Sequence, residues 1–412
     1  MNQELFQKLP DVKPKDVLAI LLYVIACPIA MLYKRKRKHL WLLCEYGEEA
    51  RDNAYYLYKY LREEHPEVDA VYAINKGSVD LDRVKILGEI ADYGSLRHWV
   101  YYLTAEVNIS SQKGGKPNAA VCYFLEVVTG WLKNTRVFLQ HGIIKDDLPF
   151  LHYEKSKLSL LMCSTKQEYR YVSQKFGYPK EAVVLTGLCR YDHLKNTSDG
   201  TCIAIMPTWR EWLYKTHKME NIERTKDFTK TSFYMIWSGV IRKILEYFCD
   251  TKIRILVCMH RNMQQYNEYF RNISQRIEMI DLKNGDVLEV LKKAACLITD
   301  YSSVAIDFAY LRKPLAYYQA DYDQFRMYHL PEGYFDYEAD GFGKVCYSEE
   351  DLLQWIDGRY KVGFKQEELY RKRTEEFFTF HDERYCERNY EAIRALLERK
   401  SKEVGRNATK KD

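Results

Sequence analysis

The sequence lacks several short motifs that mark nucleotide-binding and hydrolytic enzymes. It contains no G-x-x-x-x-G-K-[ST] phosphate loop, and Gly341 and Gly343 are not followed by the third glycine of a G-x-G-x-x-G run. It also contains no G-x-S-x-G elbow and no H-E-x-x-H metal motif. A phosphate-bearing ligand of this chain must therefore be held by other groups.

A strong excess of charge of one sign is also absent. Lys and Arg number 63 and Asp and Glu number 58, so the net charge is only +5 over 412 residues. This balance provides no global field that would draw the molecule onto nucleic acid. No nucleic-acid partner is therefore expected, and any basic function must be local.

No cysteine pair has the spacing of a disulfide framework or a zinc centre. The 11 cysteines are dispersed and form no C-x-x-C, which indicates reduced, cytosolic thiols in a chain too long to need disulfides. The D-x-D pairs Asp80/Asp82 and Asp321/Asp323 match a metal-binding pattern that also arises by chance in charged loops. The sequence therefore predicts neither a metal site nor a cofactor.

Apolar residues are plentiful, and one run of them stands out. Hydrophobic residues make up 47% of the chain, and the length predicts two or three domains. A mean hydropathy of −0.46 excludes a polytopic membrane protein. The uncharged run Val17–Tyr33, however, directly precedes the basic block Lys34–Lys38. We expect residues 1–38 to form a membrane-associating hairpin or interfacial helix, with its basic block on the anionic cytoplasmic leaflet. The alternatives are a spanning helix, for which seventeen apolar residues are the lower limit, and a buried first helix of the core.

From residue 39 onward, short β-rich runs alternate with helical patterns, which is typical of βαβ units in a mostly parallel sheet. The predicted fold class is α/β, with two Rossmann-like doubly wound domains facing a cleft. A polar stretch after Arg190 separates a first domain at 39–195 from a second at 196–395, and residues 396–412 form a basic tail. The expected strands lie at 40–46, 70–75, 84–88, 106–110, 137–140, 158–164 and 183–187, and then at 202–206, 254–259, 278–280, 296–299, 314–318 and 344–347.

Four short segments each follow a predicted strand, at the sheet edge where ligands bind in open α/β folds. They are Phe138–Gly142, Met206–Arg210, Val257–Arg261 and Leu297–Ala309. Two of them place a histidine at a strand end, His141 and His260. Such a histidine suits proton transfer near neutral pH. The alternative for each is a ring satisfied by backbone hydrogen bonds.

The other two segments supply groups for phosphate. Thr208 and Arg210 place a hydroxyl and a guanidinium in one turn, which suits a phosphate oxyanion. In the fourth segment a strand ends at Asp300, and Ser302 or Ser303 caps a helix whose amino terminus attracts anions. The alternatives are an Arg210 ion pair with a nearby carboxylate and an ordinary helix cap.

Taken together, in this order and at this spacing, the four segments resemble the CDP-glycerol glycerophosphotransferase family, the teichoic acid primases and polymerases of Gram-positive envelopes. The resemblance covers roughly residues 40 to 395. Its most specific part is LITDYSSVAIDFA at Leu297–Ala309, supported by Pro207–Arg210 and by Glu332–Tyr337.

The resemblance implies a GT-B-like pair of domains, with the acceptor at the first and the CDP donor at the second. It implies a peripheral or monotopic enzyme on the cytoplasmic membrane face. Such an enzyme transfers glycerol phosphate from CDP-glycerol to a hydroxyl of a lipid-linked acceptor, either a polyprenyl-diphosphate saccharide or a polymer, and releases CMP.

Residue roles follow from the same resemblance by position. His141 resembles the essential histidine of the family's H-G motif and would be the general base on the acceptor hydroxyl. His260 resembles the second essential histidine and would interact with the donor pyrophosphate. Thr208, Arg210, Ser302 and Ser303 would hold the phosphates, and Asp300 and Asp307 would orient the loop or contact the donor.

The sequence departs from the family pattern beside both histidines. Ile143, Ile144 and Lys145 follow the H-G pair where polymerase members usually have Thr-Pro, and Arg261 replaces the usual proline after His260. The identities of donor and acceptor therefore stay open. The alternatives are a CDP-ribitol transferase, a GT-B glycosyltransferase that uses a UDP-sugar, and a catalytically silent membrane adaptor.

Overall fold

The computed structural model describes residues 13–214, 227–329 and 332–408. Residues 1–12 of the expected membrane segment and 409–412 of the expected tail lie outside the described residues. The described chain forms two compact units. Unit 1 is drawn from Met1–His141, Pro149–His193 and Phe380–Asp412, and unit 2 from Gly142–Leu148 and Leu194–Thr379.

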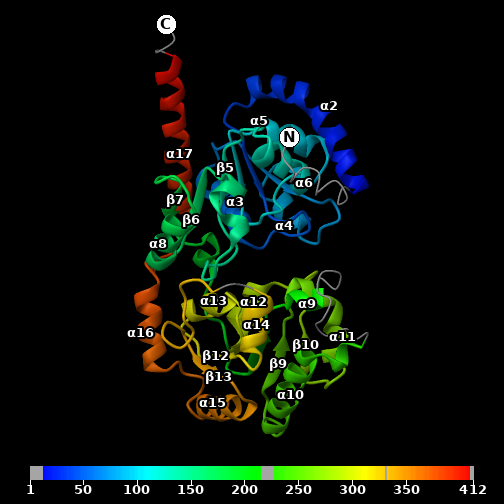
Figure 1. The fold of residues 1–412 in the computed structure, drawn as a ribbon, viewed down its shortest axis with the longest axis vertical. Coiled ribbons are helices and arrows are strands. Elements are labelled where there is room, and N and C mark those ends of the chain that lie inside the picture. Colours follow the sequence, from blue (N-terminus) through cyan, green and yellow to red (C-terminus); the bar gives the residue numbers. More distant parts are fainter. Residues whose placement is uncertain (1–12, 215–226, 330–331, 409–412) are drawn as a thin grey trace. The chain divides into compact units, whose positions relative to one another are not determined.

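Unit 1 is built on a parallel sheet (Figure 1), with seven strands in the order β3-β2-β1-β4-β5-β6-β7 among the described residues. Central strands such as Trp41–Cys44 are buried along their whole length, as expected for a parallel sheet covered on both faces. The strands are β1 (Trp41–Cys44), β2 (Ala70–Ile74), β3 (Ile90–Asp92), β4 (Val107–Ser110), β5 (Arg136–Phe138), β6 (Leu160–Cys163) and β7 (Val183–Leu185). The helices are α2 (Pro14–Lys36), α3 (Asn53–Glu64), α4 (Leu81–Lys85), α5 (Leu96–Thr104), α6 (Ala119–Tyr123), η2 (Phe124–Val128), η3 (Pro149–Leu151), α7 (Tyr153–Ser156), α8 (Lys166–Lys175), η4 (Cys189–His193) and α17 (Tyr385–Ala408).

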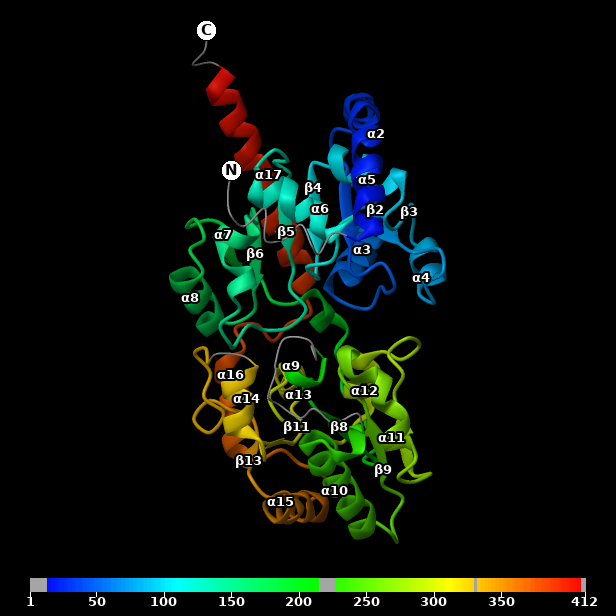
Figure 2. The same cartoon turned by 45° about the vertical axis from the view of Figure 1, so that its right-hand side comes forward.

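Unit 2 contains a second parallel sheet, with the strand order β10-β9-β8-β11-β12-β13 among the described residues (Figure 2). Strand β8 lies in the middle of the sheet. Strands β9 and β10 follow on one side of it, and β11, β12 and β13 follow on the other side. The strands are β8 (Cys202–Met206), β9 (Arg254–Val257), β10 (Ile277–Met279), β11 (Cys296–Thr299), β12 (Leu315–Tyr318) and β13 (Lys344–Cys346). The helices are α9 (Glu211–Tyr214), η5 (Phe228–Lys230), α10 (Ser232–Tyr247), η6 (Arg261–Tyr266), α11 (Asn267–Arg271), α12 (Val287–Lys293), α13 (Val304–Tyr310), α14 (Tyr322–Tyr328), α15 (Glu349–Lys361) and α16 (Glu368–Phe377).

The α/β class with two doubly wound parallel sheets is confirmed, but one expected strand is wrong. Residues 84–88 do not form a strand, because α4 ends at Lys85 and the edge strand β3 begins at Ile90. Within this short apolar run Val84 is fully buried whereas Ile86 is 85% exposed. Periodicity alone does not distinguish a strand from a helix turn in so short a run.

Helix α2 is continuous through Pro28, so residues 14–36 form one helix and not the hairpin that was one expected form of the segment. Its small residues Ala19, Ala26 and Ala30 are buried. They let the helix lie close along α5, with which it runs side by side in both cartoons (Figures 1 and 2). The rings of Tyr23 and Trp99 lie 5.6 Å apart. One face of α2 therefore belongs to the core of unit 1.

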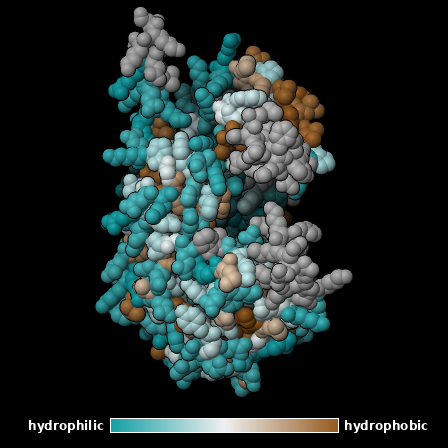
Figure 3. Space-filling view, in the orientation of Figure 1, coloured by the Kyte–Doolittle hydropathy of each residue, from teal (hydrophilic) through white to brown (hydrophobic). Residues whose placement is uncertain are grey.

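The opposite face of α2 is apolar and exposed. Val17, Leu21 and Val24 are each more than half exposed, at 60%, 56% and 58%. A brown apolar patch covers this helix in the space-filling view (Figure 3). Among the described residues, α2 is the one helix long and apolar enough to cross a membrane.

The C-terminal helix α17 packs with unit 1, although the second domain was expected to run to residue 395. The carboxylate of Asp192 accepts hydrogen bonds from the backbone N–H groups of Tyr385 and Cys386, both at 2.8 Å. The buried side chain of Asn389 accepts a hydrogen bond from the Thr186 hydroxyl at 3.1 Å. These bonds to residues near β7 explain why residues from Phe380 onward join unit 1.

Candidate functional site

Predicted site residues of unit 2 meet where β8 and β11 end side by side. Thr299 of β11 lies opposite Met206 of β8. Just beyond, the backbone N–H of Thr208 donates to Oδ1 of Asp300 at 2.8 Å. Because β9 flanks β8 and β12 flanks β11, this junction is the topological switch point of the sheet. Open α/β sheets bind ligands at such a point.

The guanidinium of Arg210 is buried at the same junction. Its Nε donates to Asp321 at 2.8 Å, and its Nη2 donates to Asp300 at 2.8 Å and to Asp321 at 3.0 Å. Its Nη1 donates to the carbonyl oxygen of Thr208 at 2.7 Å. The side chain is 1% exposed, so all three nitrogens face protein partners. The ion pair named as the alternative for Arg210 is therefore present.

The charges of this cluster balance one another in a buried setting. Burial alone would lower the pKa of the Arg210 guanidinium, but the carboxylates of Asp300 and Asp321 outweigh burial and raise it. The guanidinium carbon also lies 5.2 Å from the Tyr301 ring centroid and 5.1 Å from that of Phe325. A buried ion cluster of this kind is stable only while every partner is present.

His260 is exposed and begins the turn after β9. Its Nδ1 accepts a hydrogen bond from the backbone N–H of Asn262 at 3.2 Å, so the neutral ring carries its proton on Nε2. The ring stacks on Trp209, with centroids 5.8 Å apart and planes at 23°. This stacking places His260 beside the Thr208–Arg210 turn.

A third histidine, His329, lies against the other side of this assembly. Its ring meets Trp209 edge-on at 4.5 Å, and its Nδ1 accepts a hydrogen bond from the backbone N–H of Glu211 at 3.2 Å. Burial, together with the charges of Arg210 and His260, lowers the pKa of His329 to about 3. His329 is therefore neutral at physiological pH and can donate only through Nε2.

The serines at the start of α13 lie next to the glycine of the H-G pair. The Ser302 hydroxyl accepts from the backbone N–H of Val304 at 3.3 Å, whereas Ser303 makes no cap hydrogen bond with its side chain. A Cβ at Gly142 would lie 2.7 Å from the Ser303 hydroxyl. Only glycine therefore allows this approach. Asp307 is buried in the first turn of the same helix.

The segment Gly142–Leu148, which belongs to unit 2, contains a buried cation. The ammonium of Lys145 pairs with Asp146 and lies 5.2 Å from the Tyr337 ring centroid, and burial lowers its pKa. Asp146 also pairs with Arg326 at 3.1 Å. A Cβ at Gly333 would lie 2.1 Å from the Lys145 carbonyl oxygen, so the G-Y-F-D-Y motif packs directly against this segment.

His141 itself belongs to unit 1, at the end of the turn that follows β5. Its side chain is exposed, and its backbone carbonyl accepts a hydrogen bond from Nη1 of Arg190 at 2.9 Å. The chain continues directly into Gly142. Of the predicted residues, the structure thus brings Thr208, Arg210, Asp300, His260 and the two serines together in unit 2, and it places His141 in the other unit.

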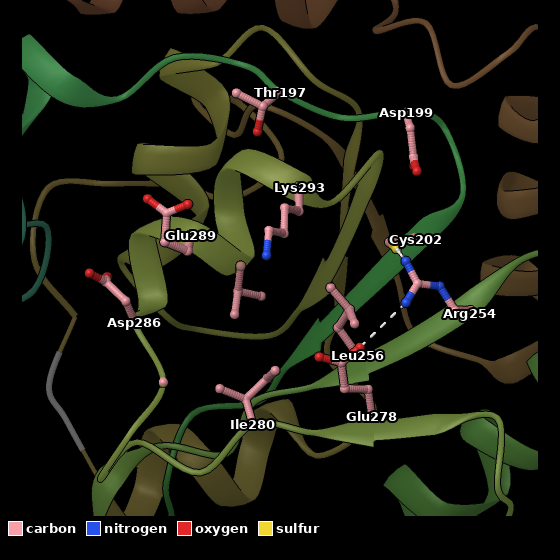
Figure 4. Close-up of a pocket in the computed structure, with 12 residues that line it drawn as sticks. Thr197, Asp199, Cys202, Arg254, Leu256, Glu278, Ile280, Asp286, Glu289 and Lys293 are labelled. Carbon is pink, nitrogen blue, oxygen red and sulfur yellow. Dashed lines mark hydrogen bonds and ion pairs between the residues drawn. The ribbon is translucent and has the colours of Figure 1, made fainter.

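A separate cavity of about 530 Å³ opens near the amino-terminal ends of β8 and β9 (Figure 4). Arg254 and Glu278 lie 3.6 Å apart in its wall. None of the predicted site residues lines it, and four carboxylates face two cations there. It therefore does not suit an anionic nucleotide. The lining residues are Thr197, Asp199, Cys202, Arg254, Leu256, Glu278, Ile280, Gly285, Asp286, Glu289, Val290 and Lys293.

Sequence reasoning missed several groups of the site. Asp321 belongs to a D-x-D pair, a pattern that also arises by chance in charged loops, yet its carboxylate binds Arg210. Gly333 belonged to a motif with no assigned role. His329 and Arg190 carried no sequence signal, because isolated polar residues are common in helices and loops.

The fold and the site together define a two-domain α/β protein of the GT-B-like class. The chain belongs to the CDP-Glycerol:Poly(glycerophosphate) glycerophosphotransferase family, which matches residues 26–395.

Individual relatives agree with this assignment. The minor teichoic acid biosynthesis protein GgaB of Bacillus subtilis is 31% identical over 372 residues, which are 87% of this chain and 40% of GgaB. The chain thus spans less than half of that relative. A teichoic acid poly(glycerol phosphate) polymerase of Bacillus spizizenii is 23% identical over 85% of this chain and 90% of its own length. A structure of the wall teichoic acid polymerase TagF with CDPG shares the fold, with a TM-score of 0.64 and 17% identity over 94% of this chain and 97% of that chain.

Removing the charge of Arg210 should lower the stability of unit 2. In Arg210→Met, Asp300 and Asp321 lose the cation that balances them in a buried site. We expect the free energy of unfolding, measured in urea by tryptophan fluorescence, to fall by about 3–5 kcal/mol. Arg271→Met is the control, since Arg271 is exposed and pairs with Glu268 within one helix, and it should change little. Equal stability of the two variants would contradict a structural role for the cluster.

Proposed function

We propose that this chain transfers glycerol phosphate from CDP-glycerol to a hydroxyl group of a membrane-linked acceptor, and that it releases CMP. The product is a teichoic acid or a related envelope or capsular polymer. The observation that carries the proposal is the convergence of Thr208, Asp300 and His260 at the switch point of unit 2, in a chain of this family. The TagF structure with CDPG supports CDP-glycerol as the donor.

The chemistry asks little covalent work of the protein. An acceptor hydroxyl oxygen forms a bond to the β-phosphorus of CDP-glycerol, the bond from that phosphorus to CMP breaks, and CMP takes the electron pair. His141 is the general base that accepts the hydroxyl proton, a role worth about 10²- to 10⁴-fold in rate. Positioning and stabilisation of the spreading phosphoryl charge supply the rest.

The donor phosphates meet hydrogen-bond donors of unit 2. The Thr208 hydroxyl has no hydrogen-bond partner among the described residues although it is buried, so a phosphate oxygen would satisfy it. Nε2–H of His260 and the hydroxyls of Ser302 and Ser303 supply further donors. The acceptor is a polyprenyl-diphosphate saccharide or a growing polymer.

Arg210, Asp300 and Asp307 orient the groups that donate hydrogen bonds to the phosphates. Each nitrogen of Arg210 already binds protein, so its role in this proposal is to fix Thr208 and Asp300. Asp300 accepts the backbone N–H groups of Thr208 and Tyr301, at 2.8 and 2.6 Å. Asp307 is buried in the first turn of α13, the helix that follows the serines, and would orient the same loop.

Donor choice provides the first test. Purified full-length protein, supplied with membrane extract as the source of acceptor, is given CDP-glycerol, CDP-ribitol or a UDP-sugar in turn. We expect CMP release from CDP-glycerol alone, since the family and the TagF structure point to that donor. CMP release from CDP-ribitol alone would change the donor. UDP release, or no release from any donor, would overturn the proposal.

Removing the proposed base provides the second test. His141→Ala should lower kcat for CMP release by about 10²- to 10⁴-fold. Donor affinity, measured by calorimetry with CDP-glycerol, should stay within a few fold. The matched control is His152→Ala, which removes another histidine of unit 1 that packs on Phe176 at 4.5 Å. Unchanged turnover in His141→Ala would remove this residue from the mechanism.

Helix α2 is proposed to seat the protein on the cytoplasmic membrane surface as a monotopic anchor. Its inner face is tied to unit 1 along the helix: Asp16 accepts from Asn118 at 2.8 Å, Tyr23 packs on Trp99, and Tyr33 lies 6.1 Å from Tyr101. A helix held in this way lies beside its domain. The exposed apolar face and the basic last turn then match the acyl boundary and the anionic headgroups.

Substitution on the exposed face of α2 separates membrane binding from folding. Leu21→Glu with Val24→Glu places two charges on that face, and we expect loss of co-sedimentation with vesicles of phosphatidylglycerol and phosphatidylcholine. Met235→Glu is the control, because Met235 is 57% exposed on α10 of the other unit. Deletion of the helix would be less informative, since it uncovers Trp99. Persistent co-sedimentation of the double variant would contradict the anchor.

A further inference from the structure

We infer that Asn53 and Arg190 are positioning residues that hold His141 in its working geometry. The inference rests on the proposed role of His141 as the general base. It concerns unit 1 alone, where three chain segments distant in sequence meet at the turn that carries this histidine. The first segment is the start of α3, the second is the turn that follows β5, and the third is η4.

The turn before His141 has a backbone conformation that does not persist unaided. Gln140 has a φ of +64°, in the left-handed region that is rarely adopted by residues other than glycine. Such a conformation is strained and persists only when the surroundings impose it. Gln140 is 1% exposed, so its surroundings are entirely protein.

Hydrogen bonds on both sides of Gln140 impose the conformation. Its side-chain amide donates to the carbonyl oxygen of Met162 and to Oε1 of Glu168, the latter at 3.1 Å. Its own carbonyl oxygen accepts from Nδ2 of Asn53 at 2.7 Å. The turn is therefore fixed through both the side chain and the main chain of its central residue.

Asn53 passes this constraint to η4. While its Nδ2 holds the turn, its Oδ1 accepts the backbone N–H of Arg190 at 3.0 Å. Asn53 is fully buried, and it is the first residue of α3, next to the N-cap Asp52. One amide side chain thus joins the helix, the turn and η4. Replacing Asn53 with alanine therefore removes both bonds at once.

Arg190 completes the arrangement by binding His141 directly. Its Nη1 donates to the His141 carbonyl oxygen at 2.9 Å and to Oδ1 of Asp52 at 2.7 Å. Asp52 is held in turn, since its Oδ2 accepts from Gln112 at 3.2 Å. The bond from Arg190 fixes the peptide group of His141 and leaves the imidazole exposed, as a base that meets a substrate requires.

The start of α3 is itself anchored by a buried carboxylate. Glu45, which follows β1 and is 1% exposed, accepts the backbone N–H groups of Arg51, Asp52 and Tyr55 at 2.9, 3.0 and 2.8 Å. The position of Asn53 is therefore set by the sheet through Glu45. The hydrogen bonds of the Asn53 side chain to Gln140 and Arg190 both lie within unit 1, so its effect on catalysis passes through the His141 turn.

The test separates positioning from binding and from folding. Arg190→Met and Asn53→Ala should each lower kcat for CMP release by about 10- to 100-fold, because small misplacements of a catalytic group carry penalties of that size. The KM for CDP-glycerol should stay within about threefold. Arg190→Lys keeps one charged donor and should recover part of the loss. Full activity of correctly folded Arg190→Met and Asn53→Ala would overturn the inference, as would a rise in KM that accounts for the whole loss.

Two further comparisons distinguish a loss of positioning from a general loss of stability. Arg388→Met removes a guanidinium that likewise binds a carbonyl and a carboxylate of unit 1, those of Thr186 and Asp382 at 3.1 and 2.8 Å. It should leave kcat unchanged. Gln140→Gly and Gln140→Ala lose the same amide, but glycine tolerates a positive φ. The glycine variant should therefore have the higher kcat, and equal values would contradict control by the turn.

The outcome for His141→Ala distinguishes this inference from the proposed function. If His141→Ala retains turnover, the assignment of the base fails. If His141→Ala is inactive while Asn53 and Arg190 tolerate substitution, the base stands and the positioning inference fails.

Discussion

The guanidinium of Arg210 ties together the ends of neighbouring strands in unit 2. It bonds to Asp300 after β11, to Asp321 after β12 and to the carbonyl oxygen of Thr208 after β8. A parallel sheet brings these strand ends to one edge, but it does not orient the loops that follow. The ion cluster provides that orientation. Thr208, the serines of α13 and the stacked rings of Trp209 and His260 all lie next to loops that Arg210 fixes.

The two units use the same physical solution with different groups. In unit 2 a buried charge is balanced by two carboxylates. In unit 1 the neutral amide of Asn53 bridges a strained turn and η4. In both cases a buried polar side chain is satisfied by partners far away in sequence, and an exposed histidine of the predicted site lies near it. Buried polar groups of this sort are worth more for geometry than for net stability.

The sequence was a good guide to the strands and to the residues that directly follow them. Hydrophobic runs such as Cys202–Met206 and Cys296–Thr299 fixed the sheet of unit 2, and the residue types after them indicated phosphate chemistry. The orientation of the side chains could not be predicted from the sequence, because it depends on their tertiary partners. Arg210 has the same sequence context whether it faces a phosphate or Asp321. Likewise, the residues near Gln140 in sequence do not predict its positive φ, because the hydrogen bonds that hold this residue involve Asn53 and Glu168.

The return of α17 to unit 1 also has a consequence for how the protein is made. Ile393 and Asn389 are fully buried, and Thr186 and Gly187, to which Asn389 is hydrogen-bonded, precede it by roughly two hundred residues. During synthesis the first sheet therefore emerges without the helix that completes its core. All of unit 2 must leave the ribosome before unit 1 can close. Until then the surface that α17 will cover is open to solvent and to chaperones, and the two domains cannot mature strictly one after the other.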